Sequence, residues 1–399
     1  AVVKDIADFY KFQKIDTTLL EQAELILRGV GASTDIVEKQ MFLLRTKGGD
    51  ALALRPEGTA PIARSYIEHG MMNLPQPIKL WYLAPFFRYE HPQAGRFRQF
   101  WQFGFEVLGE MSSALDSQII QIFYNILKEL KLKNLVVQVN SIGDSACRPY
   151  YKKVLVSYFK TRANSLCVDC RRRLRENSLR VLDCKEEKCQ QLAAGAPQLI
   201  DHLCQPCHKH FKEVLEFLDE MGLPYHLDPY LVRGLDYYTK TVFEIIEESA
   251  DGKVLGTLAA GGRYDNLVKI LGGKETSGVG GAAGLERIIE FVKKGSLRFS
   301  RGTLPQVFIA QLGTSAKRKC LKLIEDFRKE NIPVLESLGR DSLRAQLKIA
   351  DKEGIQYTLI LGQQEVLAGI IIIRDMKNGK QDTVKLARAV AEIKKRLRK

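Results

Sequence analysis

A strand-like stretch over residues 97–108 carries a carboxylate beside a glycine. With a period of two, aromatic and apolar residues lie on one face, and Gln102, Gly104 and Glu106 lie on the other. A carboxylate next to a gap in a strand's side chains needs a ligand that fills the gap and satisfies its charge. The pattern predicts a ligand-binding strand, with a polar strand face in contact with solvent as the alternative.

Arginines gather at the hairpin that contains this strand. The preceding strand candidate ends with Arg88 and Glu90 on one face, and Arg96 and Arg98 lie at the loop that joins the two strands. A guanidinium held on a rigid strand can bind a carboxylate or a phosphate through two hydrogen bonds. The hairpin is therefore predicted to bind an anionic ligand.

Two later segments combine arginine, tyrosine and aspartate. The first holds Arg233, Tyr237 and Tyr238, with a glycine that permits a turn, and the second, residues 260–265, holds Tyr264 after two glycines. The first is moderately specific for a binding site. The second is equally consistent with a hairpin end that carries an exposed tyrosine.

A glycine run over residues 278–284 nominally fits the dinucleotide-binding pattern Gly-x-Gly-x-x-Gly/Ala. That pattern requires a preceding strand, whereas residues 272–277 have the composition of a loop, which argues against a dinucleotide-dependent oxidoreductase. We expect a glycine-rich turn that leads into a helix over residues 285–293. Arg287 lies in the first turn of this helix and is either a ligand contact or part of a surface salt bridge.

Eight cysteines include two Cys-x-x-Cys pairs, Cys167 with Cys170 and Cys204 with Cys207. Four thiolates in two pairs suit a tetrahedral Zn²⁺ ion, and reduced structural thiols are the alternative. No apolar segment with a basic flank opens the chain, so we expect reduced cysteines and a cytoplasmic protein.

The elements that must position these residues follow from periodicity and turn signals. The sequence predicts, in chain order, a helix over 1–30, strands within 41–54, a helix over 59–69, strands over 78–90 and 97–108, a helix over 114–131, a strand over 134–139, a helical insertion over 145–222, and strands over 242–247 and 255–260. After a linker over 294–303, short apolar strands alternate with helical stretches, which predicts a small α/β domain with a mostly parallel sheet.

Composition and charge narrow the class of protein. The 399 residues suggest two or three domains, and 45% hydrophobic with 27% charged residues excludes disordered and fibrous chains. The apolar runs are too short to span a membrane. The net charge is +14, and residues 301–399 contribute 21 basic against 11 acidic side chains. We expect this part to bind a polyanion, with a solvated basic helix as the alternative.

Together these segments resemble the signature motifs of class II aminoacyl-tRNA synthetases, specifically of bacterial-type histidyl-tRNA synthetases. Residues 87–106 resemble class motif 2, and residues 284–287 resemble motif 3. Residues 231–244 and 260–267 resemble the two peptides peculiar to the histidine enzymes. The last hundred residues are similar to the anticodon-binding domain of this subclass, which accounts for their positive charge.

The resemblance implies an α+β fold and its division into domains. A class II catalytic domain, an antiparallel sheet flanked by helices, would span residues 1–300 with a helical insertion at about 145–222. A C-terminal α/β anticodon-binding domain would span residues 301–399. The family works as a homodimer with motif 1, around residues 15–21, at the interface. Thr18 stands where motif 1 has proline, and His91 where relatives often carry arginine.

The resemblance also implies an activity and its partners. L-Histidine would react with ATP, with Mg²⁺ on the outer phosphates, to give histidyl-adenylate, and the histidyl group would pass to the 3′ end of tRNA(His). The implied catalytic residues are Arg88, Arg233 and Arg287. Those implied for histidine are Glu57, Gly58, Thr59, Arg88, Gln102, Glu106, Arg233, Tyr237 and Tyr238, with the imidazole between Glu106 and Tyr238. Those implied for ATP are Arg88, Glu90, Arg96, Arg98, Tyr264 and Arg287.

A rival hypothesis is a synthetase-like regulatory subunit of histidine biosynthesis, which binds ligands without charging tRNA. Such relatives typically lose part of the arginine set and the anticodon-binding domain. This chain keeps Arg88, Arg233, Arg287 and a basic α/β tail, which favours the enzyme.

Overall fold

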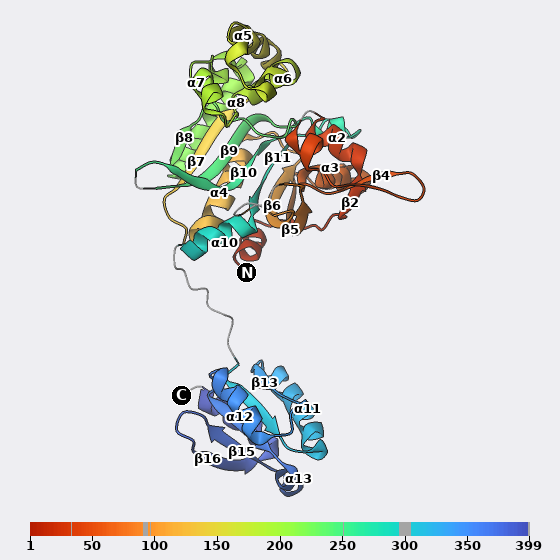
Figure 1. Cartoon of the computed structure of the whole chain (residues 1–399), viewed down its shortest axis with the longest axis vertical. Coiled ribbons are helices and arrows are strands. Elements are labelled where there is room, and N and C mark those ends of the chain that lie inside the picture. The colour runs from red at the N-terminus through yellow and green to blue at the C-terminus, as the bar shows by residue number, and fades with distance from the viewer. Residues whose placement is uncertain (33, 91–94, 96, 250, 295–304, 398–399) are drawn as a thin grey trace. The chain divides into compact units, whose positions relative to one another are not determined.

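A computed structural model describes the chain except for residues 33, 91–94, 96, 250, 295–304 and 398–399 (Figure 1). The chain divides into two compact units, Ala1–Leu297 and Arg298–Lys399. Among the described helices, none has the length and apolar character needed to cross a lipid bilayer.

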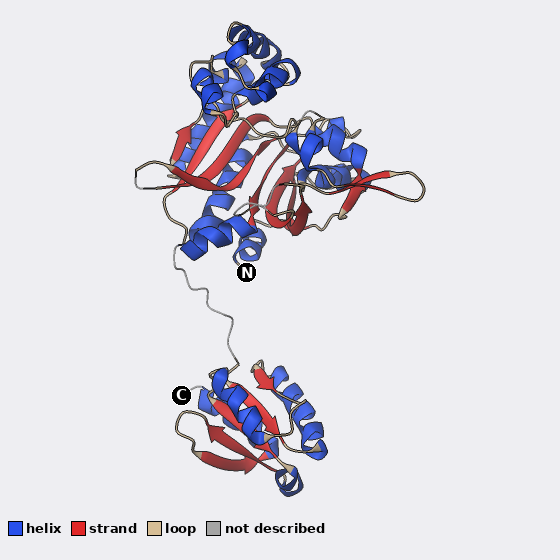
Figure 2. Ribbon diagram, in the orientation of Figure 1, coloured by secondary structure: helices blue, strands red, loops and turns tan. Residues whose placement is uncertain are grey.

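The first unit is built on an eight-stranded sheet (Figure 2). Its strands, in spatial order, are β1 (Gln13–Lys14), β5 (Ile78–Phe87), β6 (Gln99–Leu108), β11 (Gly278–Gly284), β10 (Val254–Arg263), β9 (Thr239–Glu248), β7 (Leu135–Ser141) and β8 (Tyr225–Leu227). The edge pairs β1–β5 and β7–β8 are parallel, and all other pairs are antiparallel. The predicted antiparallel sheet flanked by helices is confirmed.

Helices cover both faces of this sheet. One face packs against α4 (Ser113–Glu129) together with α1 (Val2–Phe9), α8 (Gln205–Glu220) and α10 (Leu285–Lys294), around a buried apolar cluster. Phe103 and Phe105 of β6 belong to this cluster, as their period of two predicts. The other face packs against α3 (Thr59–Glu68) and the insertion.

The insertion over residues 145–222, all of which the structure describes, contains helices and turns and no strand. Its helices are α5 (Arg148–Lys160), α6 (Val168–Glu176), α7 (Glu187–Ala193) and the start of α8, and they gather at one end of the first unit (Figure 1). Their apolar side chains share one core with the sheet face that carries α3, so the insertion is packed against the sheet.

Two predicted elements of the first unit are wrong. The single helix over residues 1–30 is instead α1, β1, β2 (Leu20–Gln22) and α2 (Ala23–Val30), because Lys11 with φ 60° ends the first helix and β1 then pairs with β5. The glycine run over 278–284 is not a turn but the central strand β11. The strands within 41–54 are present as β3 (Leu43–Arg45) and β4 (Ala51–Leu54), which form a small sheet with β2.

The second unit is a five-stranded sheet with helices. Its elements are β12 (Val307–Gln311), α11 (Thr314–Lys329), β13 (Val334–Glu336), α12 (Leu343–Lys352), β14 (Tyr357–Leu361), α13 (Gln363–Ala368), β15 (Ile370–Asp375), β16 (Gln381–Lys385) and α14 (Ala389–Leu397). Only β12 pairs in parallel, with β13 and β14, while the other two pairs are antiparallel, so the predicted mostly parallel sheet is wrong. The segment 362–369 is too short for a parallel crossover, which needs a dozen or more residues.

Candidate active site

A pocket of about 840 Å³ opens on the face of the sheet that carries α3 and the insertion. It gathers most of the predicted site residues, which are Glu57, Gly58, Thr59, Arg88, Glu90, Gln102, Arg233, Tyr237, Tyr238 and Arg287. Glu106 and Tyr264 lie behind the pocket wall. Glu106 contacts both Thr59 and Tyr264. Arg96 and His91 lie outside the described residues.

Glu57 closes the N-terminus of α3. Its carboxylate accepts hydrogen bonds from the backbone N–H groups of Thr59 at 2.7 Å and Ala60 at 2.8 Å, where a helix leaves donors without partners. The hydroxyl of Tyr237 donates to the same carboxylate at 3.2 Å. Burial raises the pKa of Glu57, and these hydrogen bonds oppose the rise. The carboxylate therefore fixes both the start of α3 and a tyrosine from the distant segment after the insertion.

Glu106 is the most deeply buried acid of the site. Thr59 Oγ1 donates to its Oε1 at 2.8 Å, and the Tyr264 hydroxyl donates to its Oε2 at 2.6 Å. Burial raises its pKa to about 8, although the Tyr264 and Thr59 hydrogen bonds act in the opposite direction. Gly280 on the neighbouring strand β11 lies opposite Glu106 in the register and leaves room for its carboxylate. This contact explains why a glycine-rich segment forms a strand here.

The two central arginines differ in their partners. Arg88 follows β5, donates from Nε to the Pro56 carbonyl at 2.9 Å and lies over the Phe100 ring at 5.3 Å. Arg233 forms an ion pair with Glu244 and lies 5.9 Å from the centre of the Tyr238 ring. Its buried Nε has no hydrogen-bond partner among the described residues. A buried donor without a partner is costly, so this nitrogen is suited to bind an anionic ligand.

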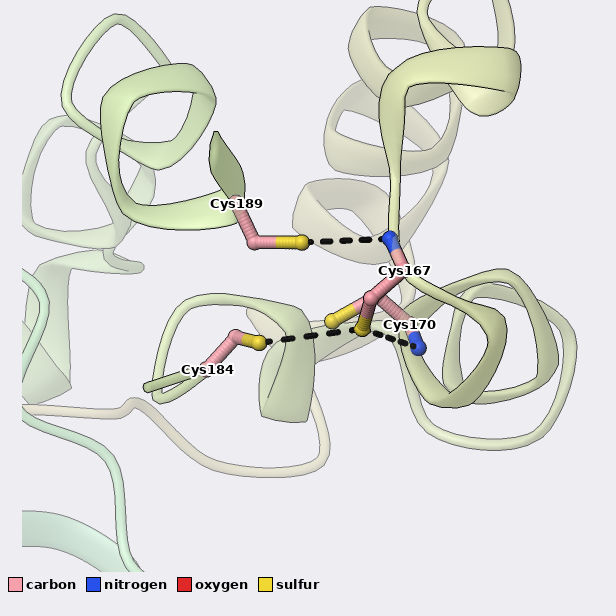
Figure 3. A group of neighbouring side chains, drawn as sticks. All are labelled: Cys167, Cys170, Cys184 and Cys189. Carbon is pink, nitrogen blue, oxygen red and sulfur yellow. Dashed lines mark hydrogen bonds between the residues drawn. The ribbon is translucent and has the colours of Figure 1, made fainter. Parts of the chain in front are cut away.

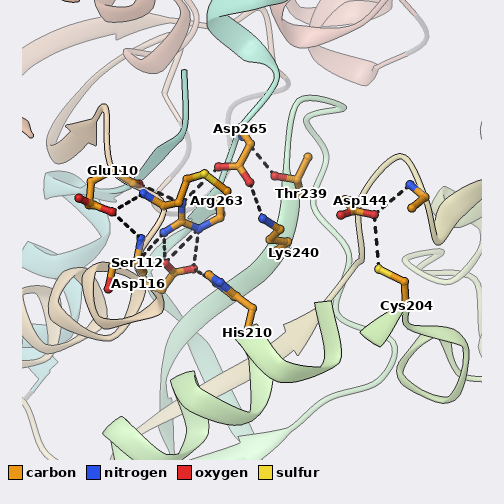
Figure 4. A network of polar contacts seen from close by, with 12 residues as sticks. Glu110, Ser112, Asp116, Asp144, Cys204, His210, Thr239, Lys240, Arg263 and Asp265 are labelled. Carbon is orange, nitrogen blue, oxygen red and sulfur yellow. Dashed lines mark hydrogen bonds and ion pairs between the residues drawn. The ribbon is translucent and has the colours of Figure 1, made fainter. Parts of the chain in front are cut away.

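Two further predicted arginines lie apart from each other. Arg287, in the first turn of α10, donates to the Thr257 carbonyl at 3.0 Å and lines the pocket. Arg98 lies over the Tyr89 ring at 4.4 Å and is not among the residues that line the pocket. Arg263, which directly precedes Tyr264, is fully buried and forms ion pairs with Asp116 and Asp265 (Figure 4).

The structure adds pocket residues that sequence reasoning missed. Tyr82 of β5 lies opposite Gly104 in the register, and its ring occupies the space that a side chain at Gly104 would need. The gap beside Gly104 is therefore filled partly by a tyrosine, and the register of the hairpin is the signal that could have found it. The insertion contributes Asp183 and Lys185 to the pocket wall, which no local sequence signal indicates.

The predicted zinc site of two Cys-x-x-Cys pairs is wrong. Cys167 and Cys170, at the start of α6, cluster with Cys184 and Cys189 (Figure 3). The other pair, at the start of α8, clusters with Cys147 and Asp144, and Figure 4 shows Cys204 directed at the Asp144 carboxylate. The pairs open two different helices, so each finds its partners among nearer segments.

Nearly the whole chain is similar to known proteins. The family profile described as "Histidyl-tRNA synthetase" matches residues 2–288, and the profile described as "Anticodon binding domain" matches residues 306–396. The chain is 43% identical over 392 residues to a histidine–tRNA ligase of Dehalococcoides mccartyi, covering 98% of this chain and 93% of that protein. A histidine–tRNA ligase of Thermodesulfovibrio yellowstonii is 43% identical over 383 residues, covering 96% and 90%.

A solved structure shows the same similarity in three dimensions. The crystal structure of apo histidyl-tRNA synthetase from S. aureus matches with a TM-score of 0.79 at 32% identity. The match covers 98% of this chain and 93% of that one.

Proposed function

The chain belongs to the histidyl-tRNA synthetase family, and we propose that it activates L-histidine with ATP and transfers the histidyl group to the 3′ end of tRNA(His). The observation that carries this proposal is the convergence of three arginines on one pocket. Arg88, Arg233 and Arg287 line it from three separate segments of the chain, and the Nε of Arg233 has no hydrogen-bond partner among the described residues. Three guanidinium groups thus reach one pocket, where a phosphate and a carboxylate would meet.

The first step needs orientation and charge stabilisation. The histidine carboxylate attacks the α-phosphorus of ATP, pyrophosphate leaves, and histidyl-adenylate forms, so no nucleophilic side chain is required. Negative charge develops on the α-phosphate oxygens, and Arg88 and Arg233 would stabilise it from two sides. One fixed donor of this kind contributes about 3 kcal/mol to a transition state that develops an oxyanion. Transfer to the 3′-hydroxyl of the terminal adenosine uses the same charge stabilisation.

ATP would bind beside the pocket arginines, with Arg287 near the outer phosphates of ATP. Mg²⁺ binds such phosphates together with one or two carboxylates, and it neutralises their charge. The pocket offers hard oxygen ligands of this type in Glu90 and Glu286. Their chemistry fits a magnesium–ATP substrate. Arg98 and Tyr264, which the resemblance also assigns to ATP, do not line the pocket in this structure.

Histidine would be recognised at the buried acids. We assign the imidazole to Tyr238, which lines the pocket, and to Glu106 behind the wall, whose Oε1 accepts a hydrogen bond from the pocket residue Thr59. Burial raises the pKa of the Tyr238 hydroxyl, so this group stays a hydrogen-bond donor. Tyr264 holds Glu106 from behind rather than binding the substrate. Glu57, Thr59 and Gln102 would hold the amino group. A pocket built on paired hydrogen bonds rejects analogues that leave its polar groups unpaired, so editing is unnecessary.

The second unit and the edge of the first would bind larger partners. The basic excess over residues 301–399 supports binding of the tRNA(His) anticodon arm. Exposed leucines around the small sheet, Leu19, Leu20, Leu43 and Leu44, support the homodimer interface near motif 1, where Thr18 donates a hydrogen bond to Glu21. None of the eight cysteines, all of which the structure describes, is in a disulfide, which supports a cytoplasmic location.

The test is charging of tRNA(His) with labelled L-histidine by the purified chain. We expect Arg233→Gln to lower adenylate formation by about 100-fold, the effect of removing one such donor, while tRNA binding is retained. Arg328→Gln, an exposed arginine paired with Glu325 in the second unit, is the matched control and should charge normally. A folded wild-type chain that binds tRNA but never charges it would overturn the proposal and favour a regulatory role.

A further inference from the structure

Four cysteines of the insertion direct their thiols toward one point. Cys167, Cys170, Cys184 and Cys189 come from three separate segments, and their sulfur atoms all lie within 4.8 Å of one another (Figure 3). Cys170 and Cys189 are fully buried, and Cys184 is nearly so. Four thiols therefore converge in the interior of the helical insertion.

One sulfur–sulfur distance in the cluster matches that between two ligands of one metal ion. Zn–S bonds of about 2.3 Å in a tetrahedron place neighbouring sulfur atoms about 3.8 Å apart. Cys167 Sγ and Cys184 Sγ lie 3.9 Å apart. A disulfide would need about 2.05 Å, so the observed separation fits shared coordination and not a covalent bond.

Backbone amides surround the sulfur atoms in the way that stabilises bound thiolates. The N–H of Cys170 donates to Cys167 Sγ at 3.3 Å, and the N–H of Cys167 donates to Cys189 Sγ at 3.3 Å. Hydrogen bonds to ligand atoms offset the negative charge of a four-thiolate site and orient the ligands. Arg173, on the helix that Cys167 opens, adds a positive charge close to Cys170 and Cys184.

We propose that Cys167, Cys170, Cys184 and Cys189 bind one structural Zn²⁺ ion. Four protein thiolates close the coordination sphere, which is the arrangement of a structural rather than a catalytic zinc. The second cluster, around Asp144, offers three thiols and is a separate set of residues. The proposal concerns the four-thiolate cluster and does not depend on the reaction assigned to the pocket.

The position of this cluster gives the metal a role. It joins the start of α6, the segment after residue 181 and α7, and Cys184 itself lines the pocket beside Asp183 and Lys185. Helix α6 is in turn held to the catalytic fold, because Arg173 pairs with Asp35 at 3.0 Å and Arg172 pairs with Glu38. A bound ion would therefore fix the wall that the insertion contributes to the active-site pocket.

Metal content of the purified full-length chain tests the proposal directly. We expect Cys184→Ser to contain one zinc per chain less than the wild type by elemental mass spectrometry. Cys207→Ser, in the second cluster, and Cys320→Ser, the buried cysteine of the second unit, are matched controls that should keep the zinc of the four-thiolate site. Equal zinc in Cys184→Ser and the wild type, or iron in place of zinc, would overturn it.

A spectroscopic measurement on the wild type covers the case in which Cys184→Ser does not fold. Zinc K-edge absorption should show sulfur ligands at about 2.3 Å. Cobalt exchanged into the chain should give the strong visible absorption of a tetrahedral site and sulfur-to-metal charge transfer. A wild-type chain that binds neither zinc nor cobalt with sulfur ligation would contradict the proposal.

Discussion

Replacing Gly280 by alanine, a change of one methyl group, should strongly destabilise the protein. The Cβ atom of this alanine would overlap the Oε2 atom of Glu106 and lie 2.6 Å from the Phe105 carbonyl oxygen. The carbonyl belongs to a paired strand and cannot move away, so the Glu106 side chain would have to leave its place. It would then lose the hydrogen bonds from Thr59 at 2.8 Å and Tyr264 at 2.6 Å.

The magnitude follows from these contacts. Overpacking a core typically costs about 1–3 kcal/mol, and each buried polar group left without a partner costs about 1–3 kcal/mol more. We therefore expect Gly280→Ala to lower the free energy of unfolding of the first unit by about 3 kcal/mol. If the same displacement removes Glu106 from the bound histidine, about 3 kcal/mol of lost binding corresponds to a roughly 100-fold loss in histidine activation.

The assay pairs thermal unfolding with histidine-dependent pyrophosphate exchange. For the unfolding measurement Gly284→Ala is the matched control, because Gly284 lies on the same strand and its added Cβ would meet nothing within 4 Å. Its stability should stay within about 0.5 kcal/mol of the wild type. Equal unfolding temperatures for Gly280→Ala and Gly284→Ala would refute the close contact between β11 and Glu106.

Two other changes probe the pocket acid and the second unit. Because burial raises the pKa of Glu106 from 4.5 to about 8, the folded wild type loses stability as pH rises between these values while the unfolded chain ionises freely. The unfolding temperature of Glu106→Gln should therefore rise relative to that of the wild type between pH 4.5 and about 8, and the difference should stay constant above pH 8. The variant should also lose histidine activation. A difference in unfolding temperature that does not change with pH would contradict this. Deleting residues 301–399 should weaken tRNA binding and flatten its salt dependence while adenylate formation changes little, and a filter-binding salt series beside the exchange assay checks this.

Much of the central hairpin could be predicted because its signal is local. The alternation in residues 97–108 separates the side chains of the core from those of the other face, and Phe103 and Phe105 lie in the core and Gln102 in the pocket as expected. Glu106 lies on the second face but behind the pocket wall, under Thr59. The period of two depends only on the strand itself. Trp101 is the exception, since it lies near the start of β6, beyond the residues that pair with β11, and remains exposed.

The strand β11 could not be predicted, because its reason lies in its neighbours. Glycine has low strand propensity, so residues 278–284 are typical of a turn when taken alone. In the fold, added side chains at Gly261 and Gly281 would press on the Phe243 ring, and at Gly280 on Glu106. Close approach between β6, β10 and β11 is a tertiary requirement that overrides the local preference.

The partners of each cysteine pair could not be predicted from the sequence either. Spacing along the chain identifies Cys167 with Cys170 and Cys204 with Cys207 as pairs, but it does not say which segments lie near each pair. The fold brings Cys184 and Cys189 to the first pair and Cys147 to the second. The choice depends on how α6 and α8 pack.

The central claim is that this pocket activates histidine. The most direct test is amino-acid-dependent exchange of labelled pyrophosphate into ATP, with the purified full-length chain and each of the twenty amino acids in turn. We predict exchange with L-histidine alone, because the paired hydrogen bonds of the pocket suit an imidazole with two ring nitrogens. Exchange with a different amino acid, or none with a folded chain, would contradict the claim.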